Sequence, residues 1–136
     1  MRAVLVDAGP LVALFDRSDR HHERCREALR SIDAPLVSAW PVLTEAMHLL
    51  GFSWDAQRAL WDLLDSETLA LLPLEYADAL RMKRLMATYR DLPMDLADAA
   101  LVRLAEREGV REIFTIDRRD FSLYRPAKIG RFTIVP

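Results

Sequence analysis

The sequence predicts an α/β fold, a three-layer sandwich in which helices cover both faces of a mostly parallel central sheet. Short apolar runs rich in β-branched residues, typical of buried parallel strands, alternate with longer segments whose apolar residues recur at helical spacing. Segments that alternate in this order form β-α-β units, and such units build a parallel sheet. The 136 residues contain no linker, repeat or low-complexity stretch, so we expect a single domain over residues 1–136.

The predicted strands are short and are separated by turn or helix signals. They are expected over residues 3–6, 35–38, 69–72, 112–116 and, at an edge of the sheet, 132–135. The first run is apolar throughout and contains two valines, which suits a central strand buried on both faces. Asp7, Gly9 and Pro10 end this run, and Asp117 ends the fourth one. We expect residues 118–121 to turn away from the sheet.

Amphipathic spacing predicts six helices between these strands. They are expected over residues 10–15, 22–32, 40–50, 54–64, 76–89 and 93–108. Pro10 lies in a first turn, where proline is favoured, and Gly109 is a typical stop residue. His21 and His22 are adjacent and do not share a helix face, so we expect both to be solvated at the start of the second helix.

The composition indicates a globular protein of the cytoplasm. Hydrophobic residues make up 51% and charged residues 29% of the chain, as in folded soluble proteins. The single cysteine, Cys25, has no partner for an internal disulfide, which favours a reducing compartment. No apolar run approaches the roughly 18 residues that span a bilayer. The net charge of −2 argues against a protein that coats nucleic acid through its overall charge.

Four acidic residues from distant parts of the chain are expected to converge at one edge of the sheet. Asp7 and Asp117 directly follow predicted strands, whereas Glu45 and Asp98 lie near the starts of predicted helices. Glu45 and Asp98 each lie roughly 120° from the centre of their helix's apolar stripe, at its flank. The carboxyl ends of parallel strands meet at one edge, where ligands bind in open α/β sheets. The four acids are therefore candidate site residues.

Helix capping is the competing explanation for some acidic residues. Asp7 is placed to cap the first helix, and this role explains it as well as a functional one does. Asp95 points away from the apolar stripe of the helix over 93–108, and capping alone accounts for it. The helix dipole alone also accounts for Asp98, so its place in a site depends on the other acids being nearby.

Clustered carboxylates favour a bound cation. They repel one another and raise one another's pKa, and a cation relieves this repulsion. Oxygen ligands suit Mg²⁺ or Mn²⁺, with Ca²⁺ as an alternative, whereas zinc is disfavoured because no Cys or His lies among these acids. Such a site can support metal-assisted phosphoryl transfer, in which the ion lowers the pKa of an attacking water. No Ser–His pair or glycine-rich phosphate loop indicates another mechanism.

Four motifs, in order along the chain, resemble those of PIN-domain ribonucleases, and most closely the VapC-type toxins of prokaryotic toxin–antitoxin pairs. The motifs are VLVDAGPLVAL (residues 4–14), TEA (44–46), LADA (96–99) and TIDRRDF (115–121). The resemblance implies a PIN-like fold and a metal-dependent endoribonuclease that hydrolyses RNA phosphodiester bonds. It also implies a divalent cation, Mg²⁺ or Mn²⁺, held by Asp7, Glu45, Asp98 and Asp117.

The same resemblance has implications for partners and for one missing contact. It implies a small antitoxin protein as the partner and a homodimer as the assembly. Many family members have Ser or Thr after the first Asp, whereas this chain has Ala8. The hydroxyl that those members carry directly after the first Asp is therefore missing from this chain.

Other residues near the four acids are candidates for supporting roles. Residues 111–136 carry six basic side chains against three acidic ones, a net charge of +3 in a chain whose total is −2. We expect Arg118 and Arg119 to contact RNA phosphates, and scattered solvated charge explains the excess equally well. Asp95, Thr115 and Asp120 are candidates for contacts around the metal-binding acids.

A non-enzymatic protein of the same fold is the main alternative. Such a PIN-like module would bind RNA or assemble with other proteins without catalysis. The four acids argue against it, because a module without chemistry has no need of a repulsive cluster. An aspartate-nucleophile phosphatase is disfavoured by Gly9, which stands where a second Asp would lie. A phosphoacceptor receiver domain is disfavoured because Asp7 stands alone and no lysine accompanies Asp117.

Overall fold

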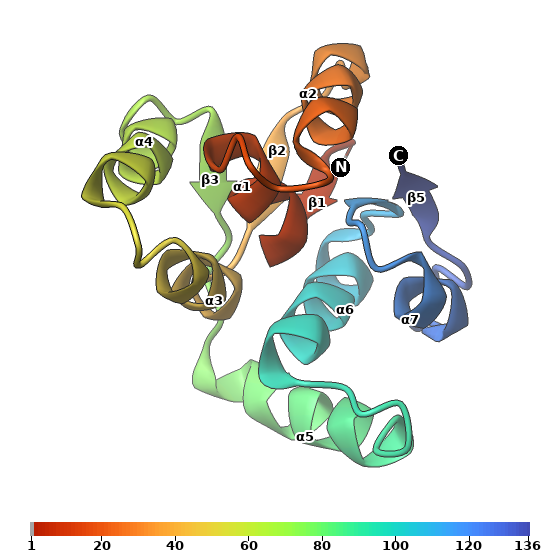
Figure 1. The fold of residues 1–136 in the computed structure, drawn as a ribbon. Coiled ribbons are helices and arrows are strands. Elements are labelled where there is room, and N and C mark those ends of the chain that lie inside the picture. Colours follow the sequence, from red (N-terminus) through yellow and green to blue (C-terminus); the bar gives the residue numbers. More distant parts are fainter. Residues whose placement is uncertain (1) are drawn as a thin grey trace.

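Five short strands form one parallel sheet in the computed structural model, which describes residues 2–136 (Figure 1). The strands are β1 (Val4–Val6), β2 (Leu36–Ser38), β3 (Leu69–Leu71), β4 (Glu112–Phe114) and β5 (Thr133–Val135). Their spatial order is β3-β2-β1-β4-β5, and each neighbouring pair is parallel. The prediction of a mostly parallel sheet is confirmed, and the fully buried β1 lies at its centre.

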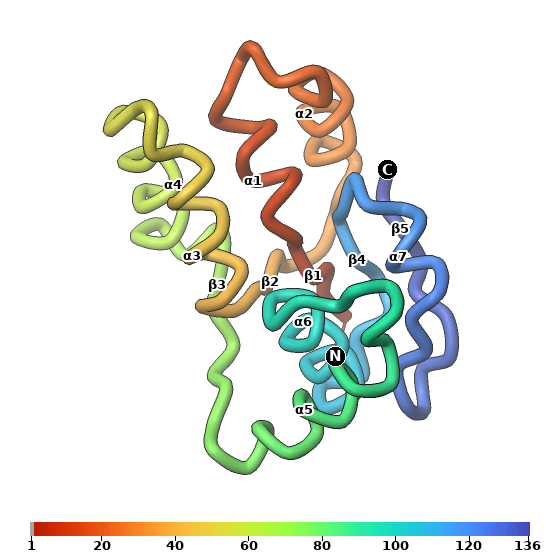
Figure 2. Tube along the Cα trace, turned by 60° about the horizontal axis from the view of Figure 1, so that its bottom comes forward, coloured from red at the N-terminus to blue at the C-terminus, as the bar shows by residue number. Residues whose placement is uncertain are grey.

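Helices cover both faces of this sheet. They are α1 (Ala8–Phe15), α2 (His22–Ser31), α3 (Trp40–Leu49), α4 (Trp54–Asp65), the 3₁₀ turn η1 (Tyr76–Asp78), α5 (Ala79–Thr88), α6 (Leu96–Glu108) and α7 (Arg118–Leu123). The chain passes from β1 to β2 to β3 and then crosses back to β4 on the other side of β1. Right-handed connections turn this reversal into two layers, α1–α4 on one face and α5–α7 on the other. Figure 2 shows α1, α2 and α4 on one side of the strands, with α5 and α6 opposite. Within residues 2–136, no helix combines the length and the apolar character that crossing a bilayer requires.

Local sequence signals set both ends of α6. The Asp95 carboxylate accepts a hydrogen bond from the Asp98 N–H at 2.8 Å, which makes Asp95 the N-cap. The helix therefore begins at Leu96, and Pro93 lies before it rather than in its first turn. At the other end, Gly109 has a left-handed backbone with φ of 68°, a conformation that glycine adopts readily at helix ends.

One local prediction is incomplete and one is wrong. The residues after Asp117 do leave the strand, but they form a helix that was not predicted, α7 (Arg118–Leu123), capped by Asp117, which accepts from the Asp120 N–H at 3.1 Å. This helix of six residues is too short to display an apolar repeat. His22 is not solvated: its side chain is 12% exposed, and Nδ1 lies 2.6 Å from the Ala13 carbonyl oxygen. That contact joins α2 to α1.

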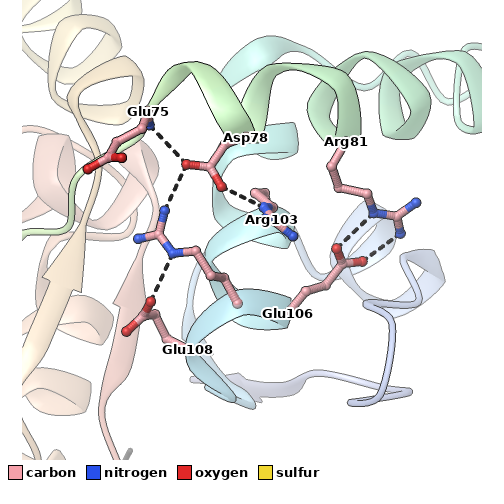
Figure 3. A network of polar contacts seen from close by, with 7 residues as sticks. Glu75, Asp78, Arg81, Arg103, Glu106 and Glu108 are labelled. Carbon is pink, nitrogen blue, oxygen red and sulfur yellow. Dashed lines mark hydrogen bonds and ion pairs between the residues drawn. The ribbon is translucent and has the colours of Figure 1, made fainter.

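Ion pairs between buried carboxylates and partly exposed arginines anchor η1 and α5 against α6 (Figure 3). Asp78 is 3% exposed, and its two carboxylate oxygens accept from Arg103 at 2.7 Å and from Arg107 at 2.8 Å. Beside it, Glu106 accepts two hydrogen bonds from the Arg81 guanidinium, at 2.8 and 2.6 Å. We call these five residues the arginine-paired cluster. It lies on the face of the sheet that carries α5 and α6.

Candidate active site

Asp7 lies where the central strand ends and the first helix begins. It follows β1 directly and is the N-cap of α1, with its Oδ1 accepting the Ala8 N–H at 2.8 Å. Its other oxygen, Oδ2, accepts the Thr115 hydroxyl at 2.8 Å. Burial raises the pKa of Asp7 to about 6, against the opposing effect of these two hydrogen bonds, and the charge of Asp117 adds to the rise. Asp7 is thus both a helix cap and a buried, oriented carboxylate.

The loop after β4 brings Thr115 and Asp117 beside Asp7. The strand ends at Phe114, so Asp117 follows it after two intervening residues and not directly as predicted. The fully buried Thr115 donates its hydroxyl to Asp7 and accepts from the Asp117 N–H at 3.0 Å. β1 and β4 are neighbours with Val6 opposite Phe114, so both chain segments leave the sheet at the same edge.

Gly9 permits the close packing of this loop against α1. A Cβ at Gly9 would lie 2.7 Å from Cγ1 and 2.9 Å from Cδ1 of Ile116. Real Cβ atoms do not approach carbon this closely, so a larger residue would displace Ile116, the neighbour of Asp117. The glycine therefore helps to set the distance between the first helix and the Asp117 loop.

Asp98 lies in the first turn of α6 and is partly buried. The helix that carries Glu45 follows a strand, whereas α6, which carries Asp98, follows another helix, α5. Its Oδ2 accepts the Tyr124 hydroxyl at 2.8 Å. Burial raises the pKa of Asp98 to about 7, the charge of Asp95 adds to the rise, and Asp7 and Asp117 contribute smaller effects. The pKa of Tyr124 is also raised, mainly by burial and then by the charge of Asp98.

Glu45 reaches the site from α3 and is partly buried. Burial raises its pKa, and the charges of Asp7 and Asp95 add to the rise. Glu45 and Asp95 also line one groove of about 610 Å³ between α3 and α6. Trp40, which is 57% exposed, lies at the start of α3 and lines the same groove. The exposed Asp95 is therefore the cap of α6 and also a charge that acts on this site.

The remaining predicted residues lie at the start of α7. Asp117 is the N-cap, and Arg118 and Arg119 are exposed on the first turn. The Arg118 guanidinium donates to the carbonyl of Pro136. Asp120 is partly buried, and its pKa is raised by burial and by Asp117. These residues lie on the first turn of α7, which begins directly after Asp117.

Asp7, Glu45, Asp98 and Asp117 form what we call the unpaired acid cluster. The charges of its members raise the pKa values of Asp7, Glu45 and Asp98. None of the four forms an ion pair with a Lys, Arg or His side chain within residues 2–136. Over the same residues, no three acidic, His or Cys side chains are already arranged as a metal-binding group. Their oxygens and unneutralised charge nonetheless fit a hard divalent cation.

Tyr124 has no feature in the local sequence that marks it as a site residue. This residue lies 26 positions from Asp98 and has no local pattern that points to a carboxylate. Tyr124 is fully buried, and its ring meets Phe121 and Tyr89 edge to face at centroid distances of 5.1 and 5.0 Å. A buried tyrosine hydroxyl needs a hydrogen-bond partner, which is the one general signal that the sequence offers.

Comparison with known proteins agrees with this geometry. The PIN domain family matches residues 4–128. Ribonuclease VapC26 of Mycobacterium tuberculosis (strain ATCC 25618 / H37Rv) is 35% identical over 136 residues, covering 98% of this chain and 100% of that protein. The crystal structure of Mycobacterium tuberculosis VapC20, described as a sarcin-ricin loop cleaving toxin, has a TM-score of 0.78 at 15% identity, covering 85% of this chain and 91% of that chain. A toxin–antitoxin complex from Klebsiella pneumoniae has a TM-score of 0.68 at 21% identity, with 88% and 91% covered. These two structures share the fold, and the family match together with the close relative shows that this chain belongs to the PIN domain family.

Proposed function

We propose that this protein is a metal-dependent endoribonuclease and the toxin of a toxin–antitoxin pair. The observation that carries the proposal is the unpaired acid cluster at the carboxyl edge of the sheet. Its carboxylates come from four separate elements and are left without basic partners. Membership of the PIN domain family and 35% identity to a ribonuclease support the same activity.

The donor set indicates which residues would hold a cation. Mg²⁺ or Mn²⁺ would be held by the oxygens of Asp7, Glu45, Asp98 and Asp117, because hard cations prefer carboxylate ligands. When bound, such an ion lowers the pKa of water and stabilises negative charge on a phosphoryl group. It would also relieve the mutual repulsion that raises the carboxylate pKa values.

The protein's own residues orient the carboxylates and the substrate. Thr115 and the Ala8 N–H hold Asp7 in one orientation through hydrogen bonds of 2.8 Å each. Arg118 and Arg119 are exposed on the turn that follows Asp117, where they can bind the phosphates that flank the cleaved bond. Binding the RNA backbone beside the acids would bring a phosphodiester bond to them.

The partner and the compartment follow from the same proposal. One structural relative is described as a toxin–antitoxin complex, which supports a small antitoxin protein as the partner of this chain. We further propose that the protein forms a homodimer and acts in the cytoplasm, where its RNA substrate lies. The buried, free Cys25 is consistent with a reducing compartment.

Metal titration combined with an RNA cleavage assay tests the proposal. We expect Mn²⁺ to bind the wild type and to raise its melting temperature by mass action. The Asp7→Asn variant should bind Mn²⁺ much more weakly and lose metal-dependent cleavage, because one carboxylate ligand is gone. Asp62→Asn, an exposed change on α4, is the matched control and should behave as the wild type. Equal Mn²⁺ affinity in all three proteins would reject the metal site, and RNA binding without cleavage would favour the non-enzymatic alternative.

A further inference from the structure

We propose that Tyr124 is a positioning residue that holds the Asp98 carboxylate in the orientation needed to bind the cation, an inference that rests on the proposed function. The Tyr124 hydroxyl donates to Asp98 Oδ2 at 2.8 Å. No other donor within residues 2–136 contacts the second oxygen, Oδ1, which stays available as a ligand. One hydrogen bond thus selects which oxygen of Asp98 is free.

The Tyr124 ring is held so that its hydroxyl has a defined position. The residue is fully buried and is the C-cap of α7. Its ring packs edge to face on Phe121 with an interplanar angle of 82° and on Tyr89 with one of 70°. Tyrosine has only two side-chain torsions, and this packing constrains both of them. The hydroxyl therefore keeps its position when the Asp98 carboxylate rotates. The carboxylate is instead held by the hydroxyl.

The Tyr124–Asp98 hydrogen bond also links two of the elements that carry the acids, α7 and α6. Asp117 caps the start of α7, and Tyr124 caps its end. The hydrogen bond to Asp98 therefore ties α7 to α6, the helix that carries the third carboxylate. Hydrogen-bond partners that orient metal ligands commonly account for about 10- to 100-fold in metal affinity or activity. We expect Tyr124 to act in this way, without touching the substrate.

The Tyr124→Phe variant removes the hydroxyl and keeps the ring. We expect its Mn²⁺ affinity, measured by titration calorimetry, to be about tenfold weaker than that of the wild type. The kcat for RNA cleavage should fall and the KM for RNA should stay unchanged, because Tyr124 does not contact RNA. Tyr89→Phe is the matched control: its ring touches Tyr124, but its hydroxyl accepts from the Arg125 N–H at 2.9 Å and not from the site. This control should keep the wild-type Mn²⁺ affinity.

A double-mutant cycle separates positioning from a general loss of structure. If Tyr124 acts through Asp98, then Tyr124→Phe should not weaken Mn²⁺ binding further in an Asp98→Asn background. An equal loss in Tyr124→Phe and Tyr89→Phe, an additive loss in the double variant, or no loss in Tyr124→Phe would each overturn the inference. A wild type that neither binds Mn²⁺ nor cleaves RNA would instead reject the proposed function itself, and this inference with it.

Discussion

The two acidic clusters of this protein use the same residue types and have opposite electrostatics. In the arginine-paired cluster, the Glu75 backbone N–H and the hydrogen bonds and charges of Arg103 and Arg107 lower the pKa of Asp78 despite its burial (Figure 3). In the unpaired acid cluster, burial and like charges raise the pKa values of Asp7 and Asp98. Burial is common to both clusters, but Asp78 has basic partners and a backbone donor that together outweigh it, whereas Asp7 and Asp98 have no basic partner.

This difference separates a structural role from a functional one. In the arginine-paired cluster each carboxylate has a basic partner, and these ion pairs join η1 and α5 to α6. The repulsion within the unpaired acid cluster destabilises the folded chain until a cation binds to the carboxylates. A buried charge without a partner is costly, and perturbed pKa values of this kind are found most often at functional sites.

The largest expected effect is the loss of activity when Asp98 loses its charge. Asp98→Asn should reduce metal-dependent RNA cleavage to background, because a carboxylate ligand is removed, while the metal-free protein keeps or gains stability as a like charge disappears. Asp95→Asn should keep most of the activity, since Asn caps a helix nearly as well as Asp. Cleavage assays paired with denaturant unfolding measure both properties. If Asp95→Asn were as inactive as Asp98→Asn, then Asp95 would be a site residue as well as a cap.

The same type of change in the arginine-paired cluster should affect stability instead. Asp78→Asn should lower the free energy of unfolding by about 3 kcal/mol, because it leaves the charges of Arg103 and Arg107 without their shared partner. Cleavage per folded molecule should stay at the wild-type level. Urea unfolding gives the stability, with the exposed Asp62→Asn as control. A loss as small as about 0.5 kcal/mol, the size typical of surface ion pairs, would show that this cluster does not anchor the helices.

The pH dependence of stability should distinguish the two clusters in metal-free protein. The raised pKa of Asp7, about 6 against an ordinary 3.8, makes the folded state hold a proton that the unfolded state releases. This contribution is fully present below about pH 4 and is lost as the pH rises through about 6, a loss of about 3 kcal/mol. Asp78 acts in the opposite direction: its lowered pKa stabilises the fold above about pH 4, and this is lost as the pH falls further.

Urea unfolding with EDTA between about pH 3 and pH 8 measures these contributions in separate windows. Asp7→Asn should reduce the decline above pH 4, of which the raised pKa of Asp98 causes a further part, and should leave the acid limb unchanged. Asp78→Asn should instead reduce the loss of stability at acid pH. Added Mn²⁺ should restore the stability of the wild type near neutral pH. A wild type whose stability rises from pH 4 to pH 7 would contradict the assignment of Asp7.

The smallest expected effect concerns Arg118 and Arg119, which lie outside the arginine-paired cluster. Removing the charges of Arg118 and Arg119 together should weaken RNA binding and reduce the slope of log affinity against log salt by about 0.7 for each lost phosphate contact. Mn²⁺ affinity should not change, because neither residue is a ligand. Arg58→Ala on α4 is the control, since the one ion pair that Arg58 forms within residues 2–136 is a surface contact of 3.9 Å with Asp55. Unchanged RNA binding of the double Ala variant across a salt series would exclude the proposed contact.

The sequence by itself determined most elements of the fold and the identities of the candidate acids. Apolar runs predicted all five strands, and caps and stop residues such as Asp95 and Gly109 set the ends of α6. Asp7, Glu45, Asp98 and Asp117 could be named because strand ends and helix starts are local features. These signals operate within a few residues, so a single sequence displays them.

Only the tertiary structure decided which side chains meet. The hydrogen bonds of Thr115 with Asp7 and of Tyr124 with Asp98 join residues 108 and 26 positions apart. The pairing of Asp78 with two arginines is equally non-local. Asp78 has no distinguishing local pattern, yet these contacts make it a main link between η1 and α6. Periodicity and capping describe neighbours along the chain, whereas these contacts depend on how the sheet order places distant segments together. That physical difference is why the candidate acids, and Thr115 beside one of them, could be named from the sequence, whereas Tyr124 and the arginine partners of Asp78 could not.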